Sequence, residues 1–301
     1  MQALFIAPVL FVLATKSSCK RADEELFQQD SSFDSYLWND NSGPKIFESP
    51  DSFVLPTSEI YRFTVNSKDP ETSNQVKIQA AFFGYFASIS QDSLIVFCHD
   101  GQFNMDFYFE QIKTLYQCGG QGKYNILLFD YQGLGLSDGK TSAEAIVQDA
   151  KAIEIWLKES SVPPQNVFIY GQGLGTIAAC ELVKDDDQNR PAPTTLILEN
   201  PLARTDYLLS SSTGLNLPSS FIDQPTIDNI EIMKDFKGSL LVMLSTQDEK
   251  YDILINGEEM YNAHNGLYKE LHRSDAMHQD LVPKLGFIAY CELVNQLILK
   301  L

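Results

Sequence analysis

Short apolar runs alternate with helix-like segments from residue 93 to the C-terminus, and this alternation restricts the fold more than any other feature. The apolar runs have the length and composition of strands buried on both faces of a sheet. They are residues 93–98, 124–129, 166–170, 194–198 and 239–244. Between them, residues 143–157 carry apolar side chains at helical spacing. Strands that alternate with helices predict a parallel sheet covered by helices on both faces.

Two more strand-like segments precede this region and complete the expected domain. Residues 60–65 and 76–86 are separated by a turn at Lys68-Asp69-Pro70, which predicts an antiparallel pair at one edge of the sheet. We therefore expect an α/β domain over residues 56–301, built on a mostly parallel, doubly wound sheet of about eight strands. Residues 200–238, rich in Ser, Pro and Asn, interrupt the alternation and are expected to form a small cap insertion.

One strand-to-helix junction has the sequence of a catalytic turn that lacks its reactive residue. Gly171-Gln172-Gly173-Leu174-Gly175 lies between the strand-like residues 166–170 and the helix-like residues 176–183. Enzymes that transfer acyl groups through a serine carry Gly-x-Ser-x-Gly in this context, the nucleophile elbow. The central residue here is Gly173, which has no oxygen to attack a carbonyl group.

The other members of a serine triad have candidates in the expected order along the chain. In this order the nucleophile comes first, the acid second and the histidine third. Asp248 follows the strand-like residues 239–244, and His278 follows the strand-like residues 269–273. Because the carboxyl ends of parallel strands share one edge of a sheet, we expect both side chains to meet Gly173 there. Gly173 would mark the lost nucleophile, His278 the base and Asp248 the group that orients it.

From about residue 60 the chain resembles the α/β-hydrolase superfamily, in its Bem46-like and serine-aminopeptidase-like branch, especially the exported bacterial members. The matching stretches are Ile95-Val-Phe-Cys-His99, Met105-Asp-Phe-Tyr108, Asp130-Tyr-Gln-Gly-Leu-Gly-Leu-Ser137-Asp-Gly139, the elbow, Asp248 and His278. The resemblance implies the α/β-hydrolase fold and descent from hydrolases of esters, thioesters or amides. It also implies a small acyl-type ligand or substrate and no cofactor. The family's oxyanion site maps to the Leu174 N–H and the loop of His99, Asp100 and Gly101.

Four residues depart from the family pattern, and two of them affect the chemistry. Gly173 replaces the elbow serine, Asp100 the loop glycine, Gln132 an arginine and Ser245 a glycine. Removal of the nucleophile from such a triad costs on the order of a million-fold in turnover. A carboxylate at Asp100 that points into the oxyanion pocket would oppose the negative charge that develops there. We therefore expect an inactive or strongly impaired member of a serine-hydrolase family.

Glycine at position 173 also has a structural explanation. The nucleophile of an elbow adopts a strained backbone conformation that costs roughly 1–3 kcal/mol. Glycine reaches positive φ with little steric penalty. Gly173→Ser is therefore expected to destabilise the fold.

The sequence of the elbow allows three functional interpretations. A non-catalytic ligand-binding protein of the cell envelope would not react with a fluorophosphonate. A residual hydrolase would use His278 and Asp248 to activate water, and His278→Ala would abolish its activity. A dinucleotide loop is disfavoured, because Thr176 stands where the third small residue belongs. No spacing of Cys, His or acidic residues indicates a metal site.

The N-terminus and the overall charge carry expectations about location and partners. Residues 3–14 are apolar but too short for a membrane span, which needs about 20 residues. With Ser17-Ser18-Cys19 they resemble a bacterial lipoprotein signal, so we expect export, either to the cell envelope with a lipid on Cys19 as the membrane tether or as a secreted protein. Residues 1–19 would form this signal and residues 20–55 a polar tether. The net charge of -18 opposes binding to nucleic acid.

Overall fold

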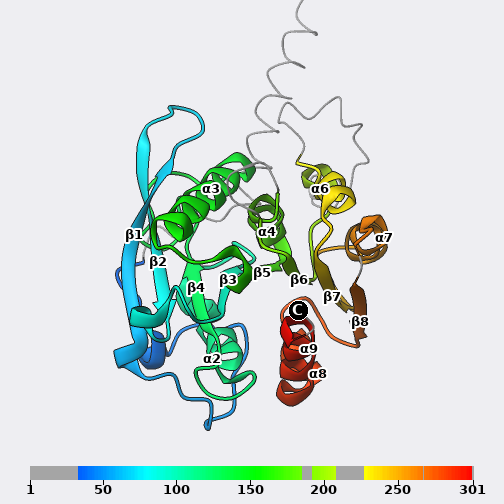
Figure 1. The fold of residues 1–301 in the computed structure, drawn as a ribbon, viewed down its shortest axis with the longest axis horizontal. Coiled ribbons are helices and arrows are strands. Elements are labelled where there is room, and N and C mark those ends of the chain that lie inside the picture. Colours follow the sequence, from blue (N-terminus) through cyan, green and yellow to red (C-terminus); the bar gives the residue numbers. More distant parts are fainter. Residues whose placement is uncertain (1–32, 185–191, 208–226, 267, 300–301) are drawn as a thin grey trace, which may run out of the picture.

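Eight strands form one mostly parallel sheet in the computed structural model, which describes residues 33–184, 192–207, 227–266 and 268–299 (Figure 1). The order across the sheet is β1-β2-β4-β3-β5-β6-β7-β8. The strands are β1 (Ile60–Lys68), β2 (Gln75–Phe83), β3 (Leu94–Cys98), β4 (Asn125–Phe129), β5 (Val167–Gln172), β6 (Thr195–Glu199), β7 (Ser239–Ser245) and β8 (Lys269–Ser274). β2 is antiparallel to β1 and to β4, and every pairing from β4 to β8 is parallel. The predicted fold class, including the antiparallel pair at one edge, is confirmed.

Helices cover both faces of this sheet (Figure 1). One face carries α3 (Ala143–Glu159), α4 (Thr176–Leu182), α6 (Asn229–Asp235) and α7 (Glu259–Ala263). The other carries α2 (Phe109–Gln117), α8 (Leu281–Leu285) and α9 (Phe287–Leu299). Each face has its own buried apolar cluster, because alternate residues of the strands point to opposite sides. The helical spacing in residues 143–157 predicted the buried face of α3, where Ile146, Ile153 and Leu157 are at most 1% exposed.

The residues that precede β1 pack against the domain, which corrects part of the tether expected for residues 20–55. Tyr36, Trp38 and Leu55 are buried in the apolar cluster beneath α2 and α9. The Asp106 carboxylate accepts hydrogen bonds from the backbone N–H of Leu37 at 2.7 Å and of Trp38 at 3.0 Å. The sequence of residues 20–55 predicted a tether because the few buried residues of this segment are scattered among exposed polar ones. Residues 1–32, including the expected signal and Cys19, lie outside the described residues.

A disulfide bond joins the end of α2 to α9, which cover the same face of the sheet. Cys118 follows the end of α2 and Cys291 lies in α9, with Cα atoms 4.8 Å apart and 173 residues between them in sequence. Nothing in the cysteine spacing predicted this pair. Cys98 and Cys180 are buried free thiols.

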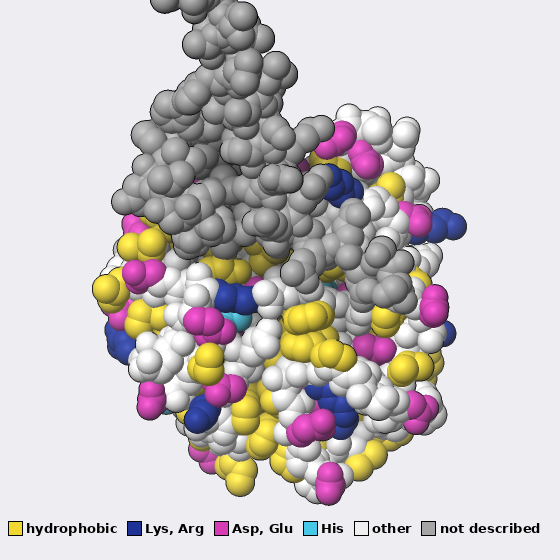
Figure 2. All heavy atoms as spheres, turned by 180° about the vertical axis from the view of Figure 1, so that it is seen from behind, with side chains coloured by type: hydrophobic (Ala, Val, Ile, Leu, Met, Phe, Trp, Pro, Cys, Tyr) yellow, Lys and Arg dark blue, Asp and Glu magenta, His cyan; other side chains and the backbone are white. Residues whose placement is uncertain are grey.

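The region expected to form a cap lies between β6 and β7. Its described part comprises residues 200–207 and 227–238 and contains α6, whose N-cap Asp228 accepts hydrogen bonds from the N–H groups of Ile230 and Glu231. Residues 208–226 of this expected cap lie outside the described residues. No helix of the described ranges has both the length and the apolarity to cross a membrane. Across the described part of the face in Figure 2, acidic side chains are widely spread and Lys and Arg side chains lie singly among them.

Candidate active site

The elbow predicted at residues 171–175 has the expected local structure. β5 ends at Gln172, a short turn spans Gly173–Gly175, and α4 begins at Thr176. Gly173 adopts φ +53°, in the left-handed region that glycine enters without strain. A Cβ atom on Gly175 would lie 2.0 Å from the carbonyl oxygen of Cys98, so only glycine lets α4 approach β3 this closely.

The predicted base, His278, and its predicted orienting acid, Asp248, lie together at the same edge of the sheet. The loop after β7 carries Asp248, the loop after β8 carries His278, and both side chains are buried. His278 Nδ1 donates a hydrogen bond to Asp248 Oδ2 at 2.8 Å. The backbone carbonyl of His278 accepts a 2.8 Å hydrogen bond from Asn200 Nδ2, and its N–H donates to Glu249 at 3.1 Å. These contacts fix the orientation of the imidazole ring.

The Asp100 carboxylate occupies the space that a side chain at position 173 would need. Its Oδ1 atom lies 1.8 Å from the position that a Cβ atom on Gly173 would take. The same oxygen accepts a 2.9 Å hydrogen bond from the backbone N–H of Leu174, which is the oxyanion donor expected in the elbow. The side chain of Asp100 is 3% exposed. A serine at position 173 and the carboxylate in its present place therefore exclude each other.

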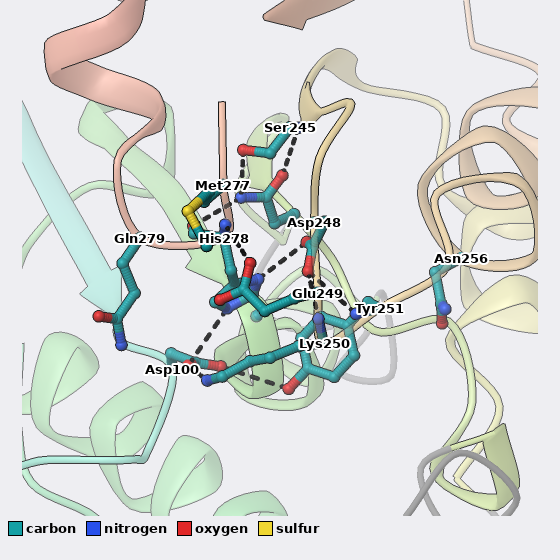
Figure 3. Close-up of polar contacts among 12 residues, drawn as sticks. Asp100, Ser245, Asp248, Glu249, Lys250, Tyr251, Asn256, Met277, His278 and Gln279 are labelled. Carbon is teal, nitrogen blue, oxygen red and sulfur yellow. Dashed lines mark hydrogen bonds and ion pairs between the residues drawn. The ribbon is translucent and has the colours of Figure 1, made fainter. Parts of the chain in front are cut away.

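Three further groups converge on this carboxylate (Figure 3). Lys250 Nζ donates to Asp100 Oδ2 at 2.7 Å, and His278 Nε2 lies 3.3 Å from the same oxygen. The Tyr251 hydroxyl donates to Asp100 Oδ1 at 3.4 Å. Each carboxylate oxygen thus has two donors, and a charge that would be costly in the interior is compensated.

The charges of this cluster shift the protonation of both the acid and the base. Burial by itself would raise the pKa of Asp100, but the Lys250 ammonium and the His278 imidazole together hold it well below its usual range. Burial by itself would lower the pKa of His278, yet the Asp100 charge and the hydrogen bonds to Asp100 and Asp248 raise it to about 9. At neutral pH His278 is therefore an imidazolium and has no lone pair with which to accept a proton.

Two members of the expected oxyanion loop, His99 and Gly101, make their polar contacts outside this cluster. Gly101 N–H donates to His99 Nδ1 at 3.1 Å, so this donor is engaged within its own loop. His99 Nε2 lies 3.3 Å from Asp130 Oδ1, and its ring packs between Tyr108 and Tyr131 with centroids 4.7 and 4.8 Å away. Of the seven residues predicted from sequence, the structure brings together Gly173, Leu174, Asp100, Asp248 and His278. Their roles stay predictions.

The other two departures from the family pattern contribute to local structure. Gln132 Nε2 donates to Asp149 Oδ1 at 2.9 Å and to the Lys68 carbonyl at 3.1 Å, which ties the turn after β4 to α3 and β1. Ser245 N–H donates to Asn200 Oδ1 at 2.7 Å, and Ser245 Oγ accepts from Asn200 Nδ2 at 2.9 Å. Neither Gln132 nor Ser245 forms a hydrogen bond with the Asp100 carboxylate.

Lys250, Tyr251 and Asn200 were not predicted from the sequence. Asp248 Oδ1 accepts hydrogen bonds from the backbone N–H of Lys250 at 2.8 Å and of Tyr251 at 3.0 Å. This turn at Asp248 directs the side chains of Lys250 and Tyr251 toward the site. The sequence signal that could have predicted both residues was Asp248 itself, because an Asp often forms such a turn with the residues two and three positions later. Asn200 directly follows β6 at positive φ, 44°, which marks the carboxyl end of a strand as a special position.

Sequence comparisons relate parts of the chain to known hydrolases, although no protein-family model matches it. It is 36% identical over 78 residues to the lysophosphatidylserine lipase ABHD12 of Danio rerio, covering 26% of this chain and 20% of that protein. It is 29% identical over 135 residues to the human α/β hydrolase domain-containing protein 17B, covering 44% of this chain and 43% of that protein. The chain thus spans less than half the length of either relative.

The fold resembles that of solved esterases over most of the domain. The Pyrococcus furiosus esterase Pf2001 superposes with a TM-score of 0.62 at 18% sequence identity, covering 86% of this chain and 99% of the esterase chain. A second crystal form of the same esterase gives a TM-score of 0.60. The chain therefore has the α/β-hydrolase fold, and its sequence similarities relate it to the α/β-hydrolase superfamily.

Proposed function

We propose that this chain is an α/β-hydrolase-fold protein that performs no acyl transfer through its elbow. The observation that carries the proposal is the Asp100 carboxylate, which fills the nucleophile's space above Gly173 and accepts the Leu174 N–H. An acyl substrate would find no attacking oxygen at residue 173 and an oxyanion donor already bound to a carboxylate.

The protonation of His278 also argues against direct activation of water in the resting site. A general base must accept a proton, and the pKa of about 9 keeps His278 protonated at neutral pH. Its Nε2 atom faces the Asp100 carboxylate at 3.3 Å and does not face an open space. Of the sequence-based readings, the geometry therefore supports the one without serine-hydrolase chemistry more strongly than residual hydrolysis by activated water.

We also propose that the protein is exported, belongs to the Bem46-like branch and is tethered to the cell envelope through Cys19. The Cys118–Cys291 disulfide supports the export, because such bonds persist in oxidising compartments. The apolar residues 3–14 and the Ser17-Ser18-Cys19 stretch support the tether. The mature N-terminus, identified by mass spectrometry in the native host, tests this part: an unmodified Cys19 or an uncleaved signal contradicts the tether.

Labelling with a fluorophosphonate tests the absence of serine acyl chemistry. The purified full chain is expected to remain unlabelled under conditions in which an active serine esterase reacts completely. A matched variant, Gly173→Ser combined with Asp100→Gly, restores the hydroxyl and removes the carboxylate that obstructs it. We expect that variant to gain labelling on the introduced serine hydroxyl. Stoichiometric labelling of the unmodified protein overturns the proposal.

A further inference from the structure

A cavity lies between the N-terminal segment and the loop that leads from β3 to α2. It has a volume of about 410 Å³ and is lined by residues within 33–44 and 102–107. This volume is within the range of roughly 300–1,000 Å³ that is typical of ligand pockets. We propose that the cavity binds a small organic ammonium ion, a protonated amine that carries an aromatic or alkyl substituent. The assignment does not depend on the absence of acyl transfer at the elbow.

Aromatic side chains form much of the cavity wall. Phe103 stacks on Phe107 with ring centroids 4.2 Å apart and an angle of 26° between the ring planes. Phe107 is buried, whereas Phe103 is 37% exposed and so offers part of its ring at the mouth. Phe33 and Leu37 line the cavity from the N-terminal segment. A cation over the face of an aromatic ring is attracted by the negative charge of that face, and more strongly where water is excluded.

The charged and polar groups of the wall favour a cation over an anion. None of the described residues that line the cavity is Lys, Arg or His. Asn41 Oδ1 accepts a hydrogen bond from the Gly43 N–H at 2.8 Å, and Gln102 Oε1 accepts one from Gln279 Nε2 at 2.9 Å. An amide oxygen has two acceptor positions, so each of these two can also accept a hydrogen bond from an ammonium group.

The Asp106 carboxylate supplies a negative charge to this wall and has no ion-pair partner among the described residues. Asp106 is 5% exposed, and its two oxygens accept the backbone N–H groups of Leu37 and Trp38. Burial and the charge of Asp130 raise the pKa of Asp106 in spite of these hydrogen bonds and of the Arg62 charge. Buried carboxylates are normally paired with a cation. An ammonium ion in the cavity would supply that missing charge.

Hydrogen bonds between the two sides hold the cavity open in the absence of a ligand. Ile46 N–H donates to the Phe107 carbonyl at 3.0 Å, and Asn41 Nδ2 donates to the Asp106 carbonyl at 3.4 Å. Leu37 N–H donates to the Asp106 carboxylate at 2.7 Å. Because these contacts already order the wall, a ligand that enters loses little affinity to the ordering of the protein.

Two matched ligands test the charge that the cavity selects. 2-Phenylethylamine is protonated at neutral pH, and 2-phenylethanol is an uncharged molecule of nearly the same shape. Isothermal titration of the full chain at neutral pH should give one amine site per chain, with an affinity about tenfold or more above that of the alcohol. Equal affinities, tighter binding of the alcohol, or no measurable binding of the amine overturns the inference.

A variant of the aromatic wall distinguishes the cavity from the rest of the acidic surface. Phe103→Leu keeps an apolar side chain but removes the aromatic face, so it should weaken amine binding about two- to fivefold. Phe86→Leu is the matched control, because Phe86 is 41% exposed, contacts other aromatic rings and does not line the cavity. It should bind the amine as the unmodified chain does. Unchanged binding by Phe103→Leu, or equal losses in both variants, places the amine elsewhere and overturns the inference.

A variant of the carboxylate gives the last measurement. Asp106→Asn removes the charge and keeps one oxygen acceptor, so the amine should lose its roughly tenfold advantage over the alcohol. An advantage that persists in this variant contradicts the role of Asp106. Thermal melting checks that the variant folds, since Asp106 also holds the N-terminal segment. If it does not fold, nuclear Overhauser contacts between the amine and the rings of Phe103 and Phe107 in the unmodified protein decide, and their absence overturns the inference.

Discussion

The two halves of the candidate site match the predicted serine triad to different extents. The base half, Asp248 and His278, keeps the 2.8 Å hydrogen bond and the buried orientation that general-base catalysis requires. In the elbow half, residue 173 is glycine, and the Asp100 carboxylate occupies the space that a side chain there would need and accepts the Leu174 N–H. The base half thus has the geometry expected of a serine triad, whereas the elbow half has the expected backbone with a carboxylate in place of a hydroxyl.

The difference shows that Gly173 and Asp100 form a complementary pair and are not two independent losses. Any side chain at position 173 would collide with Asp100, whose Oδ1 atom lies 1.8 Å from the Cβ position. A glycine in place of Asp100 would in turn leave His278 and Lys250 without their shared partner. The two departures from the family pattern, Gly173 and Asp100, thus form one structural unit. This unit affects the base half by raising the pKa of His278.

Restoring serine to the elbow half is expected to have the largest effect. Gly173→Ser must expel the Asp100 carboxylate from its four partners, so we expect a loss of about 4 kcal/mol or more in the free energy of unfolding, measured by denaturant titration. Gly120→Ser is the matched control, because Gly120 has φ +110° with nothing within 4 Å of its Cβ position. It should lose only about 1–3 kcal/mol from backbone strain.

The double variant Gly173→Ser with Asp100→Gly tests the pairing itself. It should be more stable than Gly173→Ser alone, since the collision is gone. If the single and double variants are equally unstable, the collision with Asp100 is not the cause of the instability, and Gly173 and Asp100 do not form a complementary pair.

Breaking the disulfide should have the next largest effect. The bond joins α2, which follows the Asp100 loop, to α9, which follows the His278 loop, and so it links the elements that carry the two halves. We expect Cys118→Ser with Cys291→Ser to cost about 3–4 kcal/mol in denaturant unfolding. A reducing agent should destabilise the unmodified protein to the same degree and leave this variant unchanged. A variant as stable as the unmodified protein would show that the cross-link adds nothing.

The pH dependence of stability should reveal the raised pKa of His278 that the Asp100 carboxylate causes. The pKa of His278 is raised from 6.5 to about 9, so its stabilising contribution is complete below pH 6.5 and is lost as the pH rises to 9. Between these values unfolding should become easier by at most about 3 kcal/mol. Thermal melting across this range measures the loss, and Asp100→Asn should flatten it. A melting temperature that does not change between pH 6.5 and 9 in the unmodified protein would contradict the interaction of Asp100 with His278.

Removing the Ser245 hydroxyl from the base half should have the smallest effect. Ser245→Ala removes one hydrogen bond to Asn200, at an expected cost of about 1 kcal/mol in chemical denaturation. The pKa of His278, followed by NMR, should stay near 9 because its partners Asp100 and Asp248 are untouched. A large drop in that pKa would mean that Ser245 and Asn200 hold the imidazole in place.

Much of the fold was predictable because its signals are local. Apolar runs such as residues 239–244 and the helical spacing in residues 143–157 depend on neighbours in sequence, and both gave the correct elements. The packing of residues 33–55 was not predictable in this way. Tyr36 and Trp38 are held by Asp130 and Asp106, partners that lie 94 and 68 residues away.

In the candidate site, too, residues placed by local sequence patterns were predicted and residues placed by contacts distant in sequence were missed. Chain order placed Asp248 and His278 near the elbow, since each follows a strand of one parallel sheet. Lys250 and Tyr251 were missed, because their approach to Asp100 crosses 150 and 151 residues of sequence. The disulfide was missed for the same reason, as its cysteines are separated by 173 residues.

The sequence by itself determined the α/β-hydrolase fold, the elbow and the absence of an oxygen at Gly173, because strand pattern, turn chemistry and residue identity are properties of the chain alone. Only the tertiary structure decided what lies at that position. Asp100 could have pointed outward from its loop, and the sequence offered no way to choose. The pairing of β3 with β5 places it over Gly173, where the Leu174 N–H, Lys250 and His278 compensate its buried charge.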